Sequence, residues 1–239
     1  MRFQAVRCRL KRPELIILAA LAMVAGLAIA FGYIAGDVLE GDSTAFDRTI
    51  LLGLRNSADL SDPLGPPWLE EAARNLTALG SYSVLGFVIG AAAVYLVMIR
   101  RGGAALWLLA SVIGGATLST LLKVGFDRPR PDIVGHAVRV FTRSFPSGHA
   151  ALSAVAYLTL FALLAGAATS RGLKLYFLTV ALFLTVAIGL TRIYLGVHNP
   201  TDVLAGWCFG AAWAILCCLG WFWIESRRNA GCDLDTSAG

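Results

Sequence analysis

The sequence predicts an all-α membrane protein with six transmembrane helices in one bundle, both termini in the cytoplasm, and a functional site at the outer face. Hydrophobic residues make up 57% of the 239 residues and charged residues only 15%. A typical soluble domain has about 25% charged residues. Six stretches without Asp, Glu, Lys or Arg are long enough to cross a bilayer. This composition excludes a disordered chain and argues against a soluble globule.

The expected helices form a single domain that covers residues 1–239. Backbone groups in hydrocarbon must pair within their own segment, so each apolar stretch is expected to be helical. The expected spans are about 15–36, 80–99, 102–122, 147–170, 174–192 and 202–224. Gly86 and Gly90 in the second span suit close packing against other helices of the same chain. The oligomeric state is left open, and no nucleic-acid partner is expected.

The first span has a second interpretation. Its basic start, its apolar run and the sequence Ala28-Ile29-Ala30 are also typical of a signal peptide with a cleavage site. The apolar character continues through Ala35, which favours an uncleaved anchor. Both alternatives leave the orientation of the other five spans unchanged.

The positions of the basic residues predict the orientation. With six spans, the short segments 1–14, 100–101, 171–174 and 225–239 share one side and carry more than half of the 20 Lys and Arg residues. Short basic segments mark the cytoplasmic side of a membrane protein. We therefore expect an integral protein of the bacterial inner membrane, with its site on the periplasmic or extracellular side.

Residues 37–79 form the long outer connection. Ser43 or Thr44 is placed to cap a helix, and Pro66-Pro67 marks the start of a second helix. Trp68 suits the membrane interface. We expect this segment to be a structural cap at the interface, and the alternative is a lid or a gate that faces lipid.

Segment 123–131 begins an outer loop whose positive charge runs against the orientation rule. Residues 123–143 hold five basic and two acidic residues, and a negatively charged ligand would explain the excess. Lys123 offers a point charge, and Arg130, held between two prolines, offers a planar fork; both suit phosphate oxygens. The alternative is solvation or membrane-surface electrostatics. For His136 a solvated loop position is favoured, and for Arg128, Arg139 and Arg143 solvation or paired charge; the alternative for all four is contact with a substrate headgroup.

Segment 146–149 reads Pro-Ser-Gly-His where the fourth span begins. The first turn of a helix presents free N–H groups and a positive dipole end to an anion. Gly148 permits close approach of the backbone, and Ser147 adds a hydroxyl donor. His149 would then stand beside a bound phosphate.

Segment 192–202 joins the last two spans and contains Arg192, His198 and Asp202. Asn199-Pro200 is typical of a helix start, which places Asp202 in the first turn and within reach of His198. A carboxylate on one ring nitrogen fixes the tautomer, and the other nitrogen becomes an oriented nucleophile or base. Asp202 also complements the helix dipole, a role that is compatible with the first.

In order, spacing and side of the membrane, these three segments resemble the three-part signature of the type 2 phosphatidic acid phosphatase family. That family also includes bacterial acid phosphatases and vanadium haloperoxidases. The similarity covers residues 123–202, and the six-span arrangement is similar to the integral-membrane lipid phosphate phosphatase branch. Thr191 stands where the family usually has Ser, and it keeps the hydroxyl.

The resemblance implies a metal-independent mechanism without a cofactor. His198 would attack phosphorus and form a phosphohistidine, Asp202 would orient it, and His149 would act as general acid and then base. The phosphate oxygens would be bound by Lys123, Arg130, Ser147, Gly148 and Arg192. The five cysteines have no metal-ligand or disulfide spacing.

The predicted function is hydrolysis of the terminal phosphate of a lipid phosphate or lipid diphosphate at the outer leaflet. The alternative is a lipid phosphotransferase that uses the same histidines. A haloperoxidase is less favoured because the membrane-spanning branch gives no indication of vanadate as a resident cofactor. An anionic lipid transporter is less favoured because charges stop at the ends of the expected spans. The sequence leaves four substrates open: phosphatidic acid, phosphatidylglycerol phosphate, undecaprenyl diphosphate and a lipid A phosphate.

Overall fold

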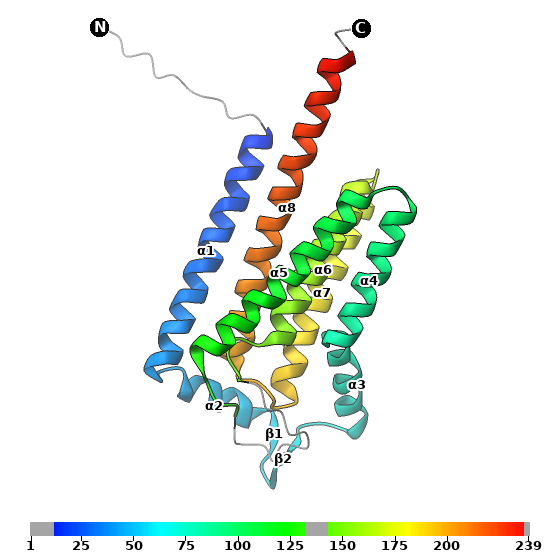
Figure 1. Ribbon diagram of the computed structural model, residues 1–239. Helices are drawn as coiled ribbons and strands as arrows, with labels where there is room; N and C mark the ends of the chain where they lie inside the picture. The colour runs from blue at the N-terminus through cyan, green and yellow to red at the C-terminus, as the bar shows by residue number, and fades with distance from the viewer. Residues whose placement is uncertain (1–11, 132–142, 237–239) are drawn as a thin grey trace, which may run out of the picture.

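A computed structural model describes residues 12–131 and 143–236, in which helices run lengthwise beside one another (Figure 1). The long helices are α1 (Arg12–Glu40), α4 (Tyr82–Met98), α5 (Gly102–Phe126), α6 (Gly148–Ala167), α7 (Arg171–Tyr194) and α8 (Pro200–Thr236). They overlie the expected spans, with ends that differ by a few residues and a longer α8. The predicted all-helical membrane fold is thus present, because each apolar run satisfies its backbone internally.

Five of these helices are long and apolar enough to cross a membrane, and α4 is the exception. It reaches membrane length only together with α3 (Pro67–Ala78), from which it is bent by 48°. The break falls at Gly80, where an added Cβ would lie 2.5 Å from Ile188 Cγ2 of α7. Ser81 then starts α4, because its hydroxyl accepts a hydrogen bond from Val84 N.

The segment between α1 and α4 folds into α2 (Thr44–Gly53), a two-stranded antiparallel hairpin of β1 (Arg55–Asn56) and β2 (Asp59–Pro63), and α3. The helix start at Pro66-Pro67 is confirmed. The predicted start of α2 at Ser43 or Thr44 is confirmed, with Ser43 at the N-cap position, but the expected side-chain cap is absent. Ser43 has helical backbone angles and no capping hydrogen bond; its hydroxyl instead accepts from Arg128. The hairpin was not predicted, because its strands are too short to show an apolar alternation.

Helix α6 lies at the centre, packed against α5, α7 and α8. Its contact with α8 is close because small residues face each other: a Cβ on Gly206 or Gly210 would come within 3 Å of backbone oxygens of Ser147 and Ala151. The predicted packing at Gly86 and Gly90 is wrong within this chain, since nothing lies within 4 Å of a Cβ built there.

The two ends of the bundle differ in what they carry. The start of α1, the α4–α5 and α6–α7 links and the last turns of α8 share one end (Figure 1). The opposite end carries α2, the hairpin and α3, together with the C-terminal ends of α5 and α7 and the N-terminal ends of α6 and α8. The three predicted functional segments therefore meet at a single end of the molecule.

Candidate active site

Each predicted site residue lies at a helix end or in a loop next to one. Lys123 is on the last turns of α5, and Arg192 is on the last turn of α7. Ser147 and Gly148 begin α6, and Asp202 is in the first turn of α8. A hydrogen bond of 2.9 Å from Ser147 N to the Asp202 carbonyl joins these two helix starts.

His198 and Asp202 form the buried pair that the sequence predicted. His198 Nδ1 lies 3.5 Å from Asp202 Oδ2, and the two residues are 1% and 0% exposed. The same carboxylate oxygen accepts hydrogen bonds from Asn199 N at 2.9 Å and from the hydroxyl of Ser144. These donors fix the carboxylate, which in turn orients the imidazole.

The other ring nitrogen of His198 faces a cation. Arg130 Nη1 lies 3.4 Å from His198 Nε2 and donates to the carbonyl of Val197 at 2.7 Å. The backbone of His198 is held as well, because its N–H donates to the carbonyl of Arg192. The imidazole therefore stands between a carboxylate on one side and a guanidinium on the other.

The protonation state of His198 follows from this environment. Burial lowers its pKa far below the usual value, although the contact with Asp202 acts to raise it. The ring is therefore neutral at pH 7. A neutral imidazole whose Nδ1 faces a carboxylate has a lone pair at Nε2, the nitrogen beside Arg130.

Lys123, Gly148 and His149 lie close to this pair. A Cβ on Gly148 would come within 3.3 Å of Lys123 Cε, and Lys123 Nζ donates to the carbonyl of Arg143 at 3.0 Å. His149 interacts electrostatically with His198 and with three cations: Arg192, Arg130 and Lys123. The predicted residues from all three segments thus gather in one cluster.

Two donors in this cluster are buried and have no hydrogen-bond partner among the described residues: Ser147 Oγ and Arg192 Nε. Buried polar groups are normally paired, so such donors mark a place where a ligand oxygen would complete the bonding. Arg192 is positioned from another side as well, because its Nη1 lies 3.4 Å from the hydroxyl of Thr77 on α3.

Four residues around the Asp202 carboxylate were not predicted as part of the site: Arg128, which is partly buried, and the buried residues Asp47, Ser144 and Thr201. For Arg128, the paired charge that was one of the expected alternatives is confirmed: its partly buried guanidinium contacts carboxylates of Asp47 and Asp202, each at 2.7 Å. Ser144 and Thr201 complete the group. One signal in the sequence could have indicated this group: Asp47 lies on the apolar face of an amphipathic segment, and a buried carboxylate requires a cation as partner.

The other loop residues behave differently. Arg143 is partly exposed and pairs with Asp127, as expected of a solvated loop cation. His136 and Arg139 lie outside the described residues. Within the described ranges, 12–131 and 143–236, no group of three or more His, Cys, Asp or Glu side chains is arranged to hold a metal ion.

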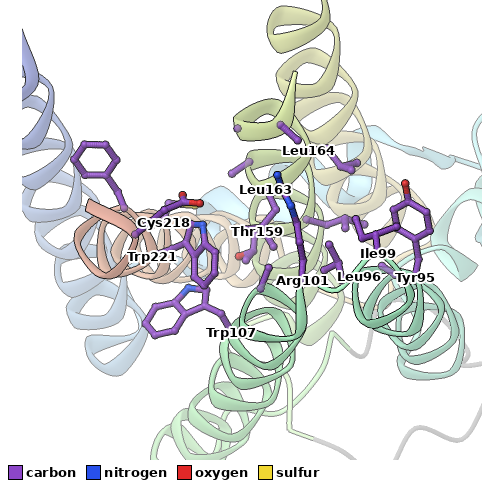
Figure 2. A pocket seen from close by; sticks show the side chains of 18 residues that line it. Tyr95, Leu96, Ile99, Arg101, Trp107, Thr159, Leu163, Leu164, Cys218 and Trp221 are labelled. Atoms are coloured by element: carbon purple, nitrogen blue, oxygen red, sulfur yellow. The ribbon is translucent and has the colours of Figure 1, made fainter. Parts of the chain in front are cut away.

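A larger cavity than those beside the charged cluster lies elsewhere. It has a volume of about 520 Å³ and is surrounded by α4, α5, α6 and α8 near Arg101, Trp107 and Trp221, at the end away from His198 (Figure 2). Most of its lining is apolar, and no histidine lines it. The reactive groups are therefore concentrated in the charged cluster, which is the candidate active site.

Comparison with known proteins gives a consistent assignment. Phosphatidylglycerophosphatase B of Bacillus subtilis is 32% identical over 146 residues, which are 60% of this chain and 71% of the relative. The lipid A 1-phosphatase of Rhizobium etli is 33% identical over 122 residues, 46% of this chain and less than half (47%) of that protein.

A solved structure supports the same conclusion. The crystal structure of a transmembrane PAP2 type phosphatidylglycerolphosphate phosphatase from Bacillus subtilis superimposes with a TM-score of 0.67 at 26% identity, covering 83% of this chain and 93% of that one. Residues 104–226, which contain all the predicted site residues, match the sequence profile of the PAP2 superfamily. With this match over half of its length, the chain belongs to the PAP2 superfamily and is an enzyme of the phosphatase class.

Proposed function

We propose that the protein is a metal-independent phosphatase that removes the terminal phosphate from a lipid phosphate or lipid diphosphate through a phosphohistidine intermediate. One observation carries the proposal: the neutral, buried His198 stands between Asp202 and Arg130, beside a cluster of cations and unpaired donors. Relatives that are membrane phosphatases of lipids support the substrate class.

In the first step, His198 Nε2 forms a bond to phosphorus while the bond from phosphorus to the lipid oxygen breaks. His149 donates a proton to the departing lipid oxygen, so the lipid leaves as an alcohol or as a lipid monophosphate. Asp202 accepts the Nδ1 proton in a hydrogen bond and stabilises the positive charge that develops on the ring.

In the second step, water attacks the phosphohistidine and gives a proton to His149. The bond between nitrogen and phosphorus breaks, inorganic phosphate leaves, and both histidines return to their starting states. Charge on the transferring group would be stabilised by Lys123, Arg130, Arg192, Ser147 and the Gly148 N–H. These donors supply the positive charge that a metal ion provides in other phosphatases.

We place the reaction at the outer leaflet of a bacterial inner membrane. Basic residues lie at the end of the bundle away from the active site: Arg100, Arg101, Arg171, Lys174 and Arg227. Short basic segments face the cytoplasm, so the site would face the opposite side. This arrangement has six spans, with α3 and α4 together forming the second, and both termini cytoplasmic.

The test is phosphate release by the purified protein in detergent from a panel of lipid phosphates and lipid diphosphates. We expect activity in excess EDTA, inhibition by vanadate, and a loss on the order of 10⁴-fold or more in His198→Ala. His149→Ala should lose roughly 10²- to 10⁴-fold. The matched control is His136→Ala, which removes the third histidine of the chain.

Each alternative gives a different result. Normal phosphate release by folded His198→Ala protein would overturn the proposal, and loss of activity on chelation would overturn metal independence. A phosphotransferase would form a phosphorylated acceptor in place of free phosphate. A transporter would move lipid across liposomes even in the His149→Ala/His198→Ala double variant.

A further inference from the structure

Arg128 joins two carboxylates that come from distant parts of the chain. Its Nη1 donates to Asp202 Oδ1 and its Nη2 donates to Asp47 Oδ2, both at 2.7 Å. The same two nitrogens also contact the hydroxyls of Thr201 and Ser43. All of these contacts come from one side chain in the loop that follows α5.

Asp47 completes a closed network between α2 and the start of α8. Its two carboxylate oxygens accept hydrogen bonds from Thr201 N at 2.9 Å and from the Thr201 hydroxyl at 2.7 Å. Asp47 is 2% exposed and Asp202 is fully buried. An N–H group in the first turn of α8 is therefore capped by a carboxylate from another helix.

The two oxygens of Asp202 have different partners. Oδ2 faces His198, Ser144 and the backbone of Asn199, whereas Oδ1 faces Arg128. Burial alone would disfavour the charged form of such a carboxylate, and a hydrogen-bonded cation restores it. Burial also acts to lower the pKa of Arg128, but Asp202 and Asp47 outweigh it and raise that pKa.

We propose that Arg128 is a positioning residue of the active site, which keeps Asp202 ionised and holds its Oδ2 against His198 Nδ1. Arg128 does not touch the reacting atoms; it acts through Asp202. Asp47 pairs with the other guanidinium nitrogen, Nη2, and so joins Arg128 to α2, whereas the contact with Asp202 is made by Nη1. This inference rests on the proposed function, because it assigns Arg128 a task in the phosphohistidine mechanism.

The role predicts a specific change in pH dependence. In Arg128→Gln, the charged form of Asp202 loses its partner at Oδ1, so Asp202 takes up a proton at higher pH than in the native protein. A protonated Asp202 no longer orients or stabilises His198. Activity should then fall with decreasing pH across a range in which the native enzyme is constant. The other titratable and charged groups around Arg128 and Asp202 are His198, Lys123, Arg130 and Asp47, and all four are retained in the variant.

The experiment compares Arg128→Gln with Asp47→Asn and Arg143→Gln, all as full-length protein in detergent with a lipid phosphate substrate. For Arg128→Gln we expect kcat to fall roughly 10- to 100-fold, with little change in KM. Losses of this size are typical when a group that hydrogen-bonds to a metal-bound histidine is removed. The acidic limb of the pH–activity profile of Arg128→Gln should shift to higher pH by about one unit or more. Asp47→Asn should lower the Tm but leave the limb in place, because the Arg128–Asp202 pair remains. Arg143→Gln removes a partly exposed cation of the same loop, and it should have the kcat, Tm and pH profile of the native enzyme.

A purely structural role for Arg128 gives another pattern. Arg128→Gln and Asp47→Asn would then lose Tm alike, and neither would move the pH limb; this result would overturn the inference. Failure of the proposed function is separate, since it would appear as normal activity in His198→Ala. An inactive His198→Ala together with a native pH profile in Arg128→Gln would overturn the role of Arg128 alone.

Discussion

His198 shows how a single residue gains its chemistry from its surroundings. A histidine at an exposed loop would be half protonated near pH 6.5. Here burial removes the ring from water and opposes the charged form, and the carboxylate of Asp202 compensates only in part. The same burial that keeps His198 neutral also makes its orientation depend on every group that holds Asp202.

The first prediction concerns the protonation of His198. The chain has three histidines, so the variant His136→Gln/His149→Gln retains His198 alone. Because the pKa is lowered, the ring should stay neutral as the pH falls from 8 through 6.5, and it should take up a proton only at lower pH. ¹⁵N chemical shifts of the imidazole in detergent report the state directly. An imidazolium spectrum at pH 6.5 would contradict the prediction.

A second prediction at this scale concerns Ser144, which donates to Asp202 from a fully buried position. Ser144→Ala removes a hydrogen bond to a charged group, an interaction worth about 1.5–3 kcal/mol. We expect kcat/KM to fall by roughly 10- to 100-fold with unchanged substrate range, measured by phosphate release. Ser83→Ala, near the start of α4, serves as the comparison; equal activities of the two variants would argue against a role for Ser144.

Among the elements, α6 and α8 carry the site because they pack unusually closely. Their contact places Gly206 and Gly210 against Ser147, Ala151 and neighbouring alanines. Close approach of the two backbones brings the starts of both helices together, where His149 and Asp202 lie. Small residues favour such contacts in membranes, where packing replaces the hydrophobic effect between helices.

The third prediction follows from this packing. In Gly210→Ala, the added Cβ would meet the carbonyl oxygen of Ala151 at 2.5 Å, and a backbone atom has little freedom to yield. We expect the free energy of unfolding in detergent to fall by about 1–3 kcal/mol. Gly86→Ala is the matched control, because open space surrounds that position. There the gain in helix propensity should leave stability equal or about 0.5–1 kcal/mol higher. A loss of equal size in both variants would contradict the packing argument.

For the whole molecule, the distribution of charge predicts the orientation in the membrane. The active-site end and the basic end are opposite ends of one bundle. Exposed apolar side chains such as Phe87 and Leu106 lie on the long helices between them, where lipid would cover them. The whole fold is thus consistent with a reaction at one membrane surface and an electrostatic anchor at the other.

The fourth prediction tests this orientation. In a variant without the five native cysteines, Ala58→Cys places a thiol in the exposed hairpin, and Gly172→Cys places one at the opposite end. A membrane-impermeant maleimide should label Ala58→Cys in cells in which the reagent can reach the outer surface of the inner membrane. Gly172→Cys should be labelled only after that membrane is permeabilised. The reverse pattern would place the active site in the cytoplasm.

The sequence alone determined the helical membrane fold, the approximate ends of the long helices and the identity of the charged cluster. These features are local: apolar runs, proline and serine at helix starts, and short motifs at their ends. It did not determine the bend angle between α3 and α4, the hairpin, or the contacts of Arg128. Asp47 lies 81 positions from Arg128 and 154 from Thr201 along the chain. Such contacts exist only once α2 packs onto the start of α8, so tertiary structure alone decided how the Asp202 carboxylate is held.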